Sequence, residues 1–276
     1  MGYGARLWLA GLGTAAAVGA SLLGQTGAAS AGMTGVRVIS GAAADTGRTQ
    51  AGSGYAPAAR TLTLGMHGAD VKALQQRLSF LHYYPGKIDG RFGWSTMEAV
   101  WAFKEVQYGK IEPPNPDIVG PLMQRQLRHP RLPRALKPHG GAWRVEVNKN
   151  IEVLVVYKRA KITLISHVST AAYYRPDGTG WITPDGRYLA WHYIQGAVAD
   201  ASFGGYMYNP VFFIRYTFAI HGMPNPTSKI SWDGVPLNAA SHGCVRIPMD
   251  VSVIFHNYVH VSPTTGTPIY ILGHNN

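Results

Sequence analysis

The single cysteine of the chain stands in a polar, glycine-containing segment, Ser241-His242-Gly243-Cys244-Val245-Arg246. A second histidine follows a β-like run, at His221-Gly222. A thiol attacks a carbonyl as the thiolate, and a neighbouring imidazole can take its proton and stabilise the charge that results. Two strand ends that bring Cys244 and His221 together would therefore supply a nucleophile and its base. We expect such an ion pair to hold the pKa of the thiol below its free value.

The neighbours of Cys244 have types suited to support an acyl transfer. Gly243 lets the backbone approach a tetrahedral oxyanion, and the N–H groups of Gly243 and Cys244 are candidate donors to it. Arg246 lies two residues beyond the cysteine, so on an extended chain it points to the same face. A guanidinium there could hold a substrate carboxylate.

Two alternative roles for these residues remain open. A lone cysteine is commonly a small buried hydrophobe, although Ser, His, Gly and Arg neighbours fit that role poorly. His221, Cys244 and His242 could bind zinc instead, but His242 and Cys244 are close in sequence and no carboxylate accompanies them. His256 and His260 are spaced for one helix face but lack a third ligand, which indicates surface residues. We expect no metal and no organic cofactor.

The elements around these residues have a β pattern from residue 143 to 274. Short runs rich in branched and aromatic residues cover 145–147, 151–157, 162–168, 187–194, 211–216 and 218–220. Only 250–258 has helical spacing, with Val251, Ile254, Phe255 and Tyr258 on one face. The pattern predicts a twisted β-sandwich or partly open barrel with one notable helix.

Residues 61–129 have a helical pattern and predict a small three-helix domain. The first helix carries Val71, Leu74, Leu78 and Leu81 at helical spacing. A second begins at a capping box, 95–98, and carries the apolar residues Ala99, Val100, Phe103 and Val106. Gly120-Pro121 opens a third, with Leu122 and Leu127. The chain is thus expected to have an α+β multidomain fold.

The N-terminus has the pattern of an export signal. Arg6 precedes a weakly polar run, 7–24, and a small-residue exit ends at Ala31. We expect cleavage there; the alternative is an uncleaved membrane anchor, although the run is marginal for the ~20 residues that a spanning helix needs. Residues 32–60 are rich in Gly, Ala, Ser and Thr and predict a flexible linker. Both alternatives place the rest of the chain outside the cytoplasm.

The charge of the chain favours anionic surroundings. Lys and Arg number 25 against 14 Asp and Glu, a formal net charge of +11. Nucleic acid, lipid head groups and acidic wall polymers all fit this charge. Residues 130–142 form a basic, proline-rich linker in which Arg131, Arg134 and Lys137 would align on one side of a polyproline helix. We favour a solvated semi-rigid linker over a binding stripe.

The helical segment resembles the peptidoglycan-binding domain family of three small helices. The resemblance rests on Leu64-Gly65, Gly68, Asp70-Val71, Leu74-Gln75, Ile88-Asp89-Gly90-Arg91-Phe92-Gly93 and Ala99-Val100. It implies that this domain holds the protein on peptidoglycan. The alternative is a generic three-helix module without a ligand.

The β segment resembles the L,D-transpeptidase catalytic domain family. The family signature is a His-Gly, a spacer and Ser/Thr-His-Gly-Cys-x-Asn/Arg, which His221-Gly222 and 241–246 match. Residues 182–188 are similar to its Thr-Pro-x-Gly-x-Tyr/Phe element. Residues 207–213 resemble the strand before the catalytic histidine, and Tyr208 on it is a candidate for substrate binding.

This second resemblance implies a cysteine transpeptidase. Cys244 would attack a tetrapeptide stem of peptidoglycan, release D-Ala and pass the acyl group from a thioester to a neighbouring stem, which gives a 3-3 cross-link. His221 would be the base, the carbonyl of Gly222 its orienter, and Ser241 and His242 would shape the site.

Four other functions stay open at this point. They are an L,D-carboxypeptidase, a ligase of wall proteins, a non-catalytic wall-binding protein and a zinc peptidase. The expected partners are peptidoglycan stem peptides and glycan, with no nucleic acid, and with a membrane only if the export signal is uncleaved.

Overall fold

The computed structural model describes residues 54–110, 116–171, 181–200, 205–223 and 235–274, which all lie within one compact unit of the chain. The expected export signal and most of the expected linker at 32–60 lie outside these residues. Its last residues, however, are in contact with the helical domain: Tyr55 Oη and the Ala58 N–H donate to Gln124 Oε1 at 3.2 and 2.6 Å. The last residues of the expected linker, from 55 to 58, therefore belong to the surface of the helical domain.

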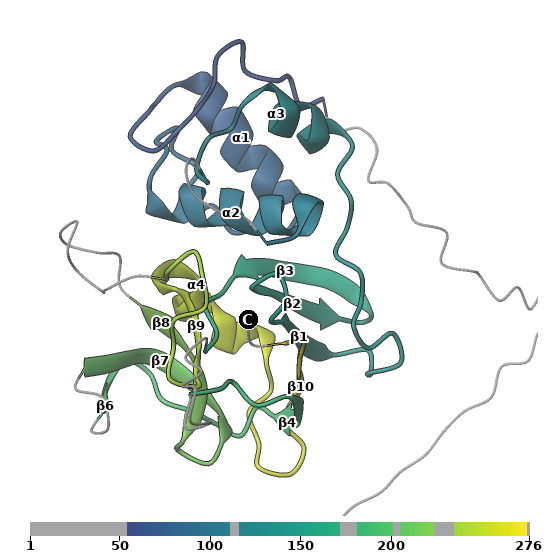
Figure 1. Cartoon of the computed structure of the whole chain (residues 1–276), viewed down its shortest axis with the longest axis vertical. Coiled ribbons are helices and arrows are strands. Elements are labelled where there is room, and N and C mark those ends of the chain that lie inside the picture. The colour runs from purple at the N-terminus through teal and green to yellow at the C-terminus, as the bar shows by residue number, and fades with distance from the viewer. Residues whose placement is uncertain (1–53, 111–115, 172–180, 201–204, 224–234, 275–276) are drawn as a thin grey trace, which may run out of the picture. The chain divides into compact units, whose positions relative to one another are not determined.

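Three helices lie where the sequence predicts them: α1 (Ala69–Phe80), α2 (Trp94–Tyr108) and α3 (Pro121–Arg128) (Figure 1). Val71, Leu74 and Leu78 of α1 are fully buried, as their spacing requires. Pro121 occupies the first turn of α3, where its missing N–H leaves no hydrogen bond unmade. Of the two leucines named for this helix, Leu127 is fully buried and Leu122 is exposed.

The start of α2 differs from the predicted capping box. The helix begins at Trp94 after Gly93, and no side chain caps it. Ser95 Oγ instead donates to the Asp250 carboxylate, and Thr96 Oγ1 donates to the Pro85 carbonyl at 3.1 Å. Glu98 is buried. The polar side chains that could cap the helix make tertiary contacts instead.

The β domain consists of two mixed sheets, so the described chain has an α+β fold. The first sheet has the order β3-β2-β1-β10-β4 and the second β5-β7-β8-β9, with β6 on β7. Within these sheets β1–β10 and β8–β9 pair in parallel and the other pairs are antiparallel. The strands are β1 (Arg144–Asn148), β2 (Val153–Lys158), β3 (Lys161–His167), β4 (Gly186–Leu189), β5 (His192–Tyr193), β6 (Ala197–Asp200), β7 (Gly205–Ile214), β8 (Phe218–Met223), β9 (Val245–Pro248) and β10 (Pro268–Leu272).

Strand β2 is buried on both faces. Leu154 and Val156 belong to the core between the two sheets, whereas Val153, Val155 and Tyr157 pack into the core of the helical domain. A strand covered on both sides needs no polar alternation, which explains the continuous apolar run. The helical domain thus packs on the first sheet through its β2 and β3 strands, as Figure 1 shows.

Helix α4 (Met249–Phe255), yellow in Figure 1, is the predicted helix of the β domain, and its expected last residues form a 3₁₀ turn, His256–Tyr258. Val251 and Phe255 enter the core between the sheets. Among the described residues no helix has the length and apolarity needed to cross a membrane.

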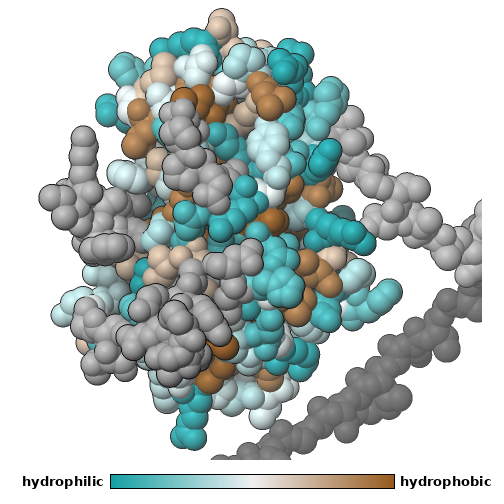
Figure 2. Space-filling model, in the orientation of Figure 1, coloured by the Kyte–Doolittle hydropathy of each residue, from teal (hydrophilic) through white to brown (hydrophobic). Residues whose placement is uncertain are grey.

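The linker at 130–142 lies along both domains. The Arg131 N–H donates to Gln107 Oε1 at 2.9 Å, and the N–H groups of Leu136 and Lys137 donate to the Glu146 carboxylate at 2.7 and 3.2 Å. On the face shown in Figure 2, apolar residues form separate patches among hydrophilic ones.

Candidate active site

Strands β8 and β9 bring the predicted nucleophile and base to one sheet face. The parallel register pairs Ile220 with Val245 and His221 with Arg246. Paired residues share a face and alternate residues return to it, so Cys244, Arg246 and His221 lie on the same side. The Ala219 N–H, at the position beside Cys244, donates to Cys244 Sγ at 3.4 Å. Cys244 therefore lies beside Ala219 at the start of β8, and His221 lies two residues further along the same face.

The hydrogen bonds of His221 define its tautomer. Its Nδ1 lies 3.1 Å from the carbonyl oxygen of Gly222, which can only accept, so Nδ1 carries the proton and donates. The unprotonated nitrogen of the neutral ring is then Nε2. The imidazole is buried, and it has the tautomer that a general base needs.

Burial gives this pair a resting charge state that the sequence did not predict. Burial raises the pKa of the Cys244 thiol to about 11, and it lowers the pKa of His221 to about 4. The expected thiolate–imidazolium pair is therefore wrong for the resting protein, because desolvation penalises both charges. At neutral pH the Cys244 thiol and the His221 imidazole are therefore both uncharged.

Ser241 organises the turn that carries the cysteine. Its Oγ donates to the Cys244 carbonyl at 2.5 Å and accepts from the Gly243 N–H at 3.1 Å. The Gly243 N–H, predicted as an oxyanion donor, thus donates to Ser241 instead. The Cys244 N–H remains as the predicted donor.

Both glycines of the signature meet a steric requirement. Gly243 has φ of +127°, and a Cβ there would overlap the Phe218 ring. A Cβ on Gly222 would overlap Ser252 of α4. Helix α4 therefore packs against the backbone of Gly222, whose carbonyl orients His221.

The other predicted site residues lie around this centre. Arg246 pairs through its backbone with Ser169, and its N–H donates to the Ser169 carbonyl at 3.0 Å. The His242 ring packs edge-on against Trp181 at 5.7 Å, and burial lowers the pKa of His242. The register places Tyr208 opposite Gly222 rather than beside His221. A substrate contact by Tyr208 stays a prediction.

Three residues that were not among the predicted site residues also support the turn. Thr183 Oγ1 accepts from the Ala171 N–H at 2.9 Å and donates to the Cys244 carbonyl at 3.4 Å. The Thr170 carbonyl accepts from the Ser241 N–H at 2.9 Å, and Ser169 Oγ donates to the Asn238 carbonyl at 2.8 Å. Only Thr183 had a signal, its place in the 182–188 element.

No cluster of three or more His, Cys, Asp or Glu side chains suited to a metal ion occurs in the part of the chain that the structure describes. His221 and Cys244 are engaged with Gly222 and Ala219 respectively. Residues 224–234, which are part of the spacer between His221-Gly222 and Ser241, lie outside the described residues.

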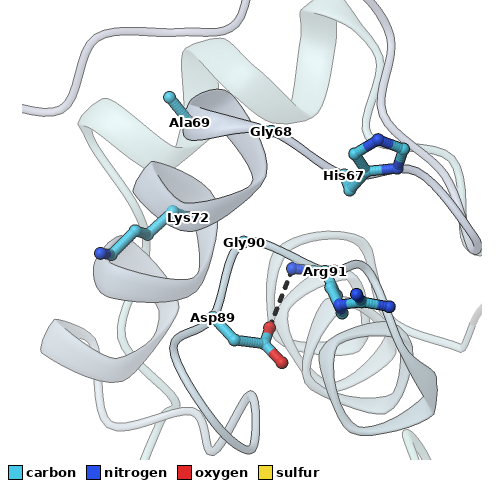
Figure 3. Close-up of a pocket in the computed structure, with 7 residues that line it drawn as sticks. All are labelled: His67, Gly68, Ala69, Lys72, Asp89, Gly90 and Arg91. Atoms are coloured by element: carbon cyan, nitrogen blue, oxygen red, sulfur yellow. Dashed lines mark hydrogen bonds between the residues drawn. The ribbon is translucent and has the colours of Figure 1, made fainter.

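A hollow lies in the helical domain, at the start of α1 (Figure 3). It measures about 410 Å³ and is lined by His67, Gly68, Ala69, Lys72, Asp89, Gly90 and Arg91. The Gly68 N–H donates to the Gly90 carbonyl at 2.9 Å, and the Asp89 carboxylate accepts from the Arg91 N–H at 2.8 Å. These bonds fix the backbone that lines the hollow, and two exposed cationic side chains, Lys72 and Arg91, lie at it.

Comparisons with known proteins agree with both domains. Residues 67–108 match the peptidoglycan binding domain family, and residues 142–271 match the L,D-transpeptidase catalytic domain family. The fold is similar to the crystal structure of an L,D-transpeptidase from Xylanimonas cellulosilytica, with a TM-score of 0.61 and 27% identity over 79% of this chain and 100% of that one.

Curated relatives match over a shorter stretch. A spore cortex-lytic enzyme of Oceanobacillus iheyensis is 46% identical over 54 residues, which are 20% of this chain and 18% of that protein. One from Bacillus subtilis is 50% identical over 48 residues, 17% of this chain and 15% of that protein. The chain thus spans less than a fifth of the length of these relatives.

Proposed function

Because residues 142–271 form an L,D-transpeptidase catalytic domain and residues 67–108 a peptidoglycan-binding domain, we propose that this chain is an exported cell-wall enzyme that forms 3-3 cross-links in peptidoglycan. One observation carries the proposal. Cys244 and His221 share a sheet face, and the Gly222 carbonyl holds His221 in the tautomer that leaves Nε2 free of a proton.

In the first half-reaction Cys244 Sγ attacks the carbonyl of the third residue of a tetrapeptide donor while His221 Nε2 takes the thiol proton. The Cys244 N–H stabilises the oxyanion. Collapse breaks the peptide bond to D-Ala, whose nitrogen takes the proton from the His221 imidazolium. A thioester on Cys244 and free D-Ala result.

In the second half-reaction the side-chain amine of the third residue in a neighbouring stem attacks the thioester. Its proton passes to His221 Nε2, the new amide forms, and the proton returns to the departing Cys244 thiolate. Arg246, on the same face, binds a carboxylate of a stem. Ser241 and His242 hold the shape of the turn.

The helical domain concentrates the enzyme on its polymer. We place peptidoglycan at the hollow beside Lys72 and Arg91, because those cations and the formal net charge of +11 suit an anionic wall. Binding there raises the local concentration of stems at the second domain. The enzyme is accordingly placed outside the membrane, associated with the wall.

The test is incubation of the full chain with a disaccharide tetrapeptide, followed by mass spectrometry of the products. We expect a 3-3 linked dimer and free D-Ala, and neither with Cys244→Ala, whose circular dichroism should match the native protein. Tripeptide without dimer would identify an L,D-carboxypeptidase. If the native chain gives no product, the result would favour a non-catalytic wall-binding protein. Activity that is lost only when a chelator is added would indicate a zinc peptidase.

A further inference from the structure

A buried ion pair joins the two domains. Nδ1 of His167, at the end of β3, lies 2.9 and 3.0 Å from the two carboxylate oxygens of Glu105 on α2. The two side chains are 0% and 2% exposed. The Trp101 ring packs edge-on against the imidazole at 5.3 Å. Two ionisable groups from different domains are therefore both desolvated. Their burial is costly in free energy unless each of their hydrogen-bonding atoms has a partner.

The other nitrogen of His167 reaches a third segment. Its Nε2 lies 2.9 Å from the Pro236 carbonyl, an oxygen that can only accept, so Nε2 carries a proton. Nδ1 shared between two carboxylate oxygens is also a donor, and a ring with two N–H groups is an imidazolium. Burial by itself lowers the pKa of His167, but the Glu105 carboxylate, the Pro236 carbonyl and, more weakly, the Glu152 carboxylate raise it to about 9 overall.

Pro236 belongs to the segment that leads into the cysteine turn, residues 235–240. The Asn238 carbonyl of this segment accepts from Ser169 Oγ, and the Ala240 N–H donates to the Thr170 carbonyl at 2.8 Å. Leu237 packs against the core that contains the helical domain. Residues 235–240 are thus hydrogen-bonded to β3 and to the residues that follow it. Among these partners, His167 is a charged side chain.

We propose that Glu105 and His167 are positioning residues for the reaction: the helical domain, through this pair and the Pro236 carbonyl, holds the 235–240 segment in the conformation that presents Cys244. This rests on the proposed function only in that Cys244 is the reacting group. The N-terminal domain then has two tasks, polymer binding and support of the catalytic turn.

The chemistry of a neutral histidine shows why the carboxylate matters. Without Glu105 the buried imidazolium loses its counter-charge and releases a proton, and a neutral ring donates from one nitrogen only. A glutamine at 105 could donate its amide N–H to Nδ1 and leave the Nε2 proton on Pro236. A methionine of similar size cannot donate to Nδ1, so this buried nitrogen would be left without a partner and the ring would be held less firmly. Glu105→Gln is therefore the conservative variant and Glu105→Met the disruptive one.

The experiment compares the full chain with Glu105→Met, Glu105→Gln and His167→Phe, and with Glu98→Met as the matched control. Glu98 lies on the same helix and is also buried, and burial raises its pKa to about 8 as it raises that of Glu105 to about 7. Both ring nitrogens of His167 are bonded to Glu105 and Pro236, so Glu98→Met leaves these hydrogen bonds in place. The two readouts are amide hydrogen exchange in 235–244 and steady-state kinetics on a soluble tetrapeptide.

Glu105→Met and His167→Phe should speed amide exchange in 235–244 roughly tenfold and lower kcat with little change in KM. Glu105→Gln and Glu98→Met should stay near the native values. Equal loop exchange in all variants, with only the melting temperature lowered, would overturn the proposal and leave a pair that merely joins two domains.

If either disruptive variant does not fold, the other decides, and the native protein supplies a third readout. The ¹⁵N spectrum of His167 should show both ring nitrogens protonated at neutral pH; a neutral ring would contradict the proposal. The amide-exchange and ¹⁵N measurements do not require turnover, so they test the positioning role even if the native chain makes no cross-link. Absence of a cross-link would contradict the proposed function and not this inference.

Discussion

At the scale of single residues, burial sets the protonation of the candidate site. Desolvation raises the pKa of Cys244 and lowers that of His221, and the cation of Arg246 lowers both. Cys244 and His221 are therefore both uncharged at neutral pH, beside the cation of Arg246. The proposed mechanism accordingly needs a proton transfer while the substrate carbonyl is attacked, with Nε2 of His221 already in the accepting tautomer.

The first prediction concerns the alkylation rate of Cys244 as a function of pH. The inflection should lie above the free-cysteine value of ~8.5, toward the pKa of about 11 that burial produces. Arg246→Gln should move it higher, because a cation that favours the thiolate is lost, whereas His221→Gln should move it little. Stopped-flow alkylation of the folded chain measures this, with His242→Gln as the control. An inflection below ~8.5 would contradict this prediction and would favour a resting thiolate–imidazolium pair.

The second prediction concerns Gly243. Gly243→Ala places a methyl group at φ of +127° against the Phe218 ring, so the turn must shift. We expect a loss of about 1–3 kcal/mol in the free energy of unfolding and a large loss of turnover. Denaturant unfolding and product assays measure both.

Gly205→Ala is the matched control, because a Cβ at Gly205 meets no atom within 4 Å. It should change stability by less than about 1 kcal/mol. Equal effects at the two positions would mean that the steric argument for Gly243 is wrong.

At the scale of elements, the candidate residues could be named from the sequence more readily than the strands that bring them together. Cys244 and His221 were selected from residue types alone. Their relative position comes from the parallel pairing of β8 with β9, and β9 was not predicted because it is four residues long and directly follows the cysteine turn. Strand β10 was also missed; it begins at a proline and is five residues long.

Tertiary contacts explain most of the remaining differences. Residues 95–98 have the sequence of a capping box, but the Ser95 and Thr96 hydroxyls donate hydrogen bonds to residues outside the helix. Thr183 and Cys244 are 61 residues apart, and no local pattern reveals a hydrogen bond over such a distance. The resting charges were mispredicted for the same reason, because burial is not visible in a motif.

The third prediction tests this support of the turn. Thr183→Val keeps the shape of the side chain but removes the hydroxyl that bridges Ala171 and Cys244. The buried Ala171 N–H then loses its acceptor, which should cost about 1–3 kcal/mol of stability and lower turnover. Thr163→Val is the control, since its hydroxyl donates to the Val156 carbonyl within the first sheet. A control variant with the same loss of turnover would remove the special role of Thr183.

At the scale of the whole molecule, the helical domain is more than an attachment. It covers Val153, Val155 and Tyr157 of β2 and supplies Glu105 to the pair with His167. The hollow beside Lys72 lies elsewhere on the domain, at the start of α1. The proposed peptidoglycan binding and the proposed support of the Cys244 turn are therefore assigned to different residues, and substitutions can test them separately.

The last prediction uses this separation. In the full chain, Lys72→Gln with Arg91→Gln should reduce sedimentation with purified peptidoglycan several-fold, because two cations beside the hollow are lost. Turnover of small soluble stems should stay near native, since neither residue touches the turn of Cys244. Arg131→Gln with Arg134→Gln in the linker removes the same charge and serves as the control. If the linker variant binds as weakly as the first, and if modest salt abolishes all binding, net charge rather than the hollow attaches the protein to the wall.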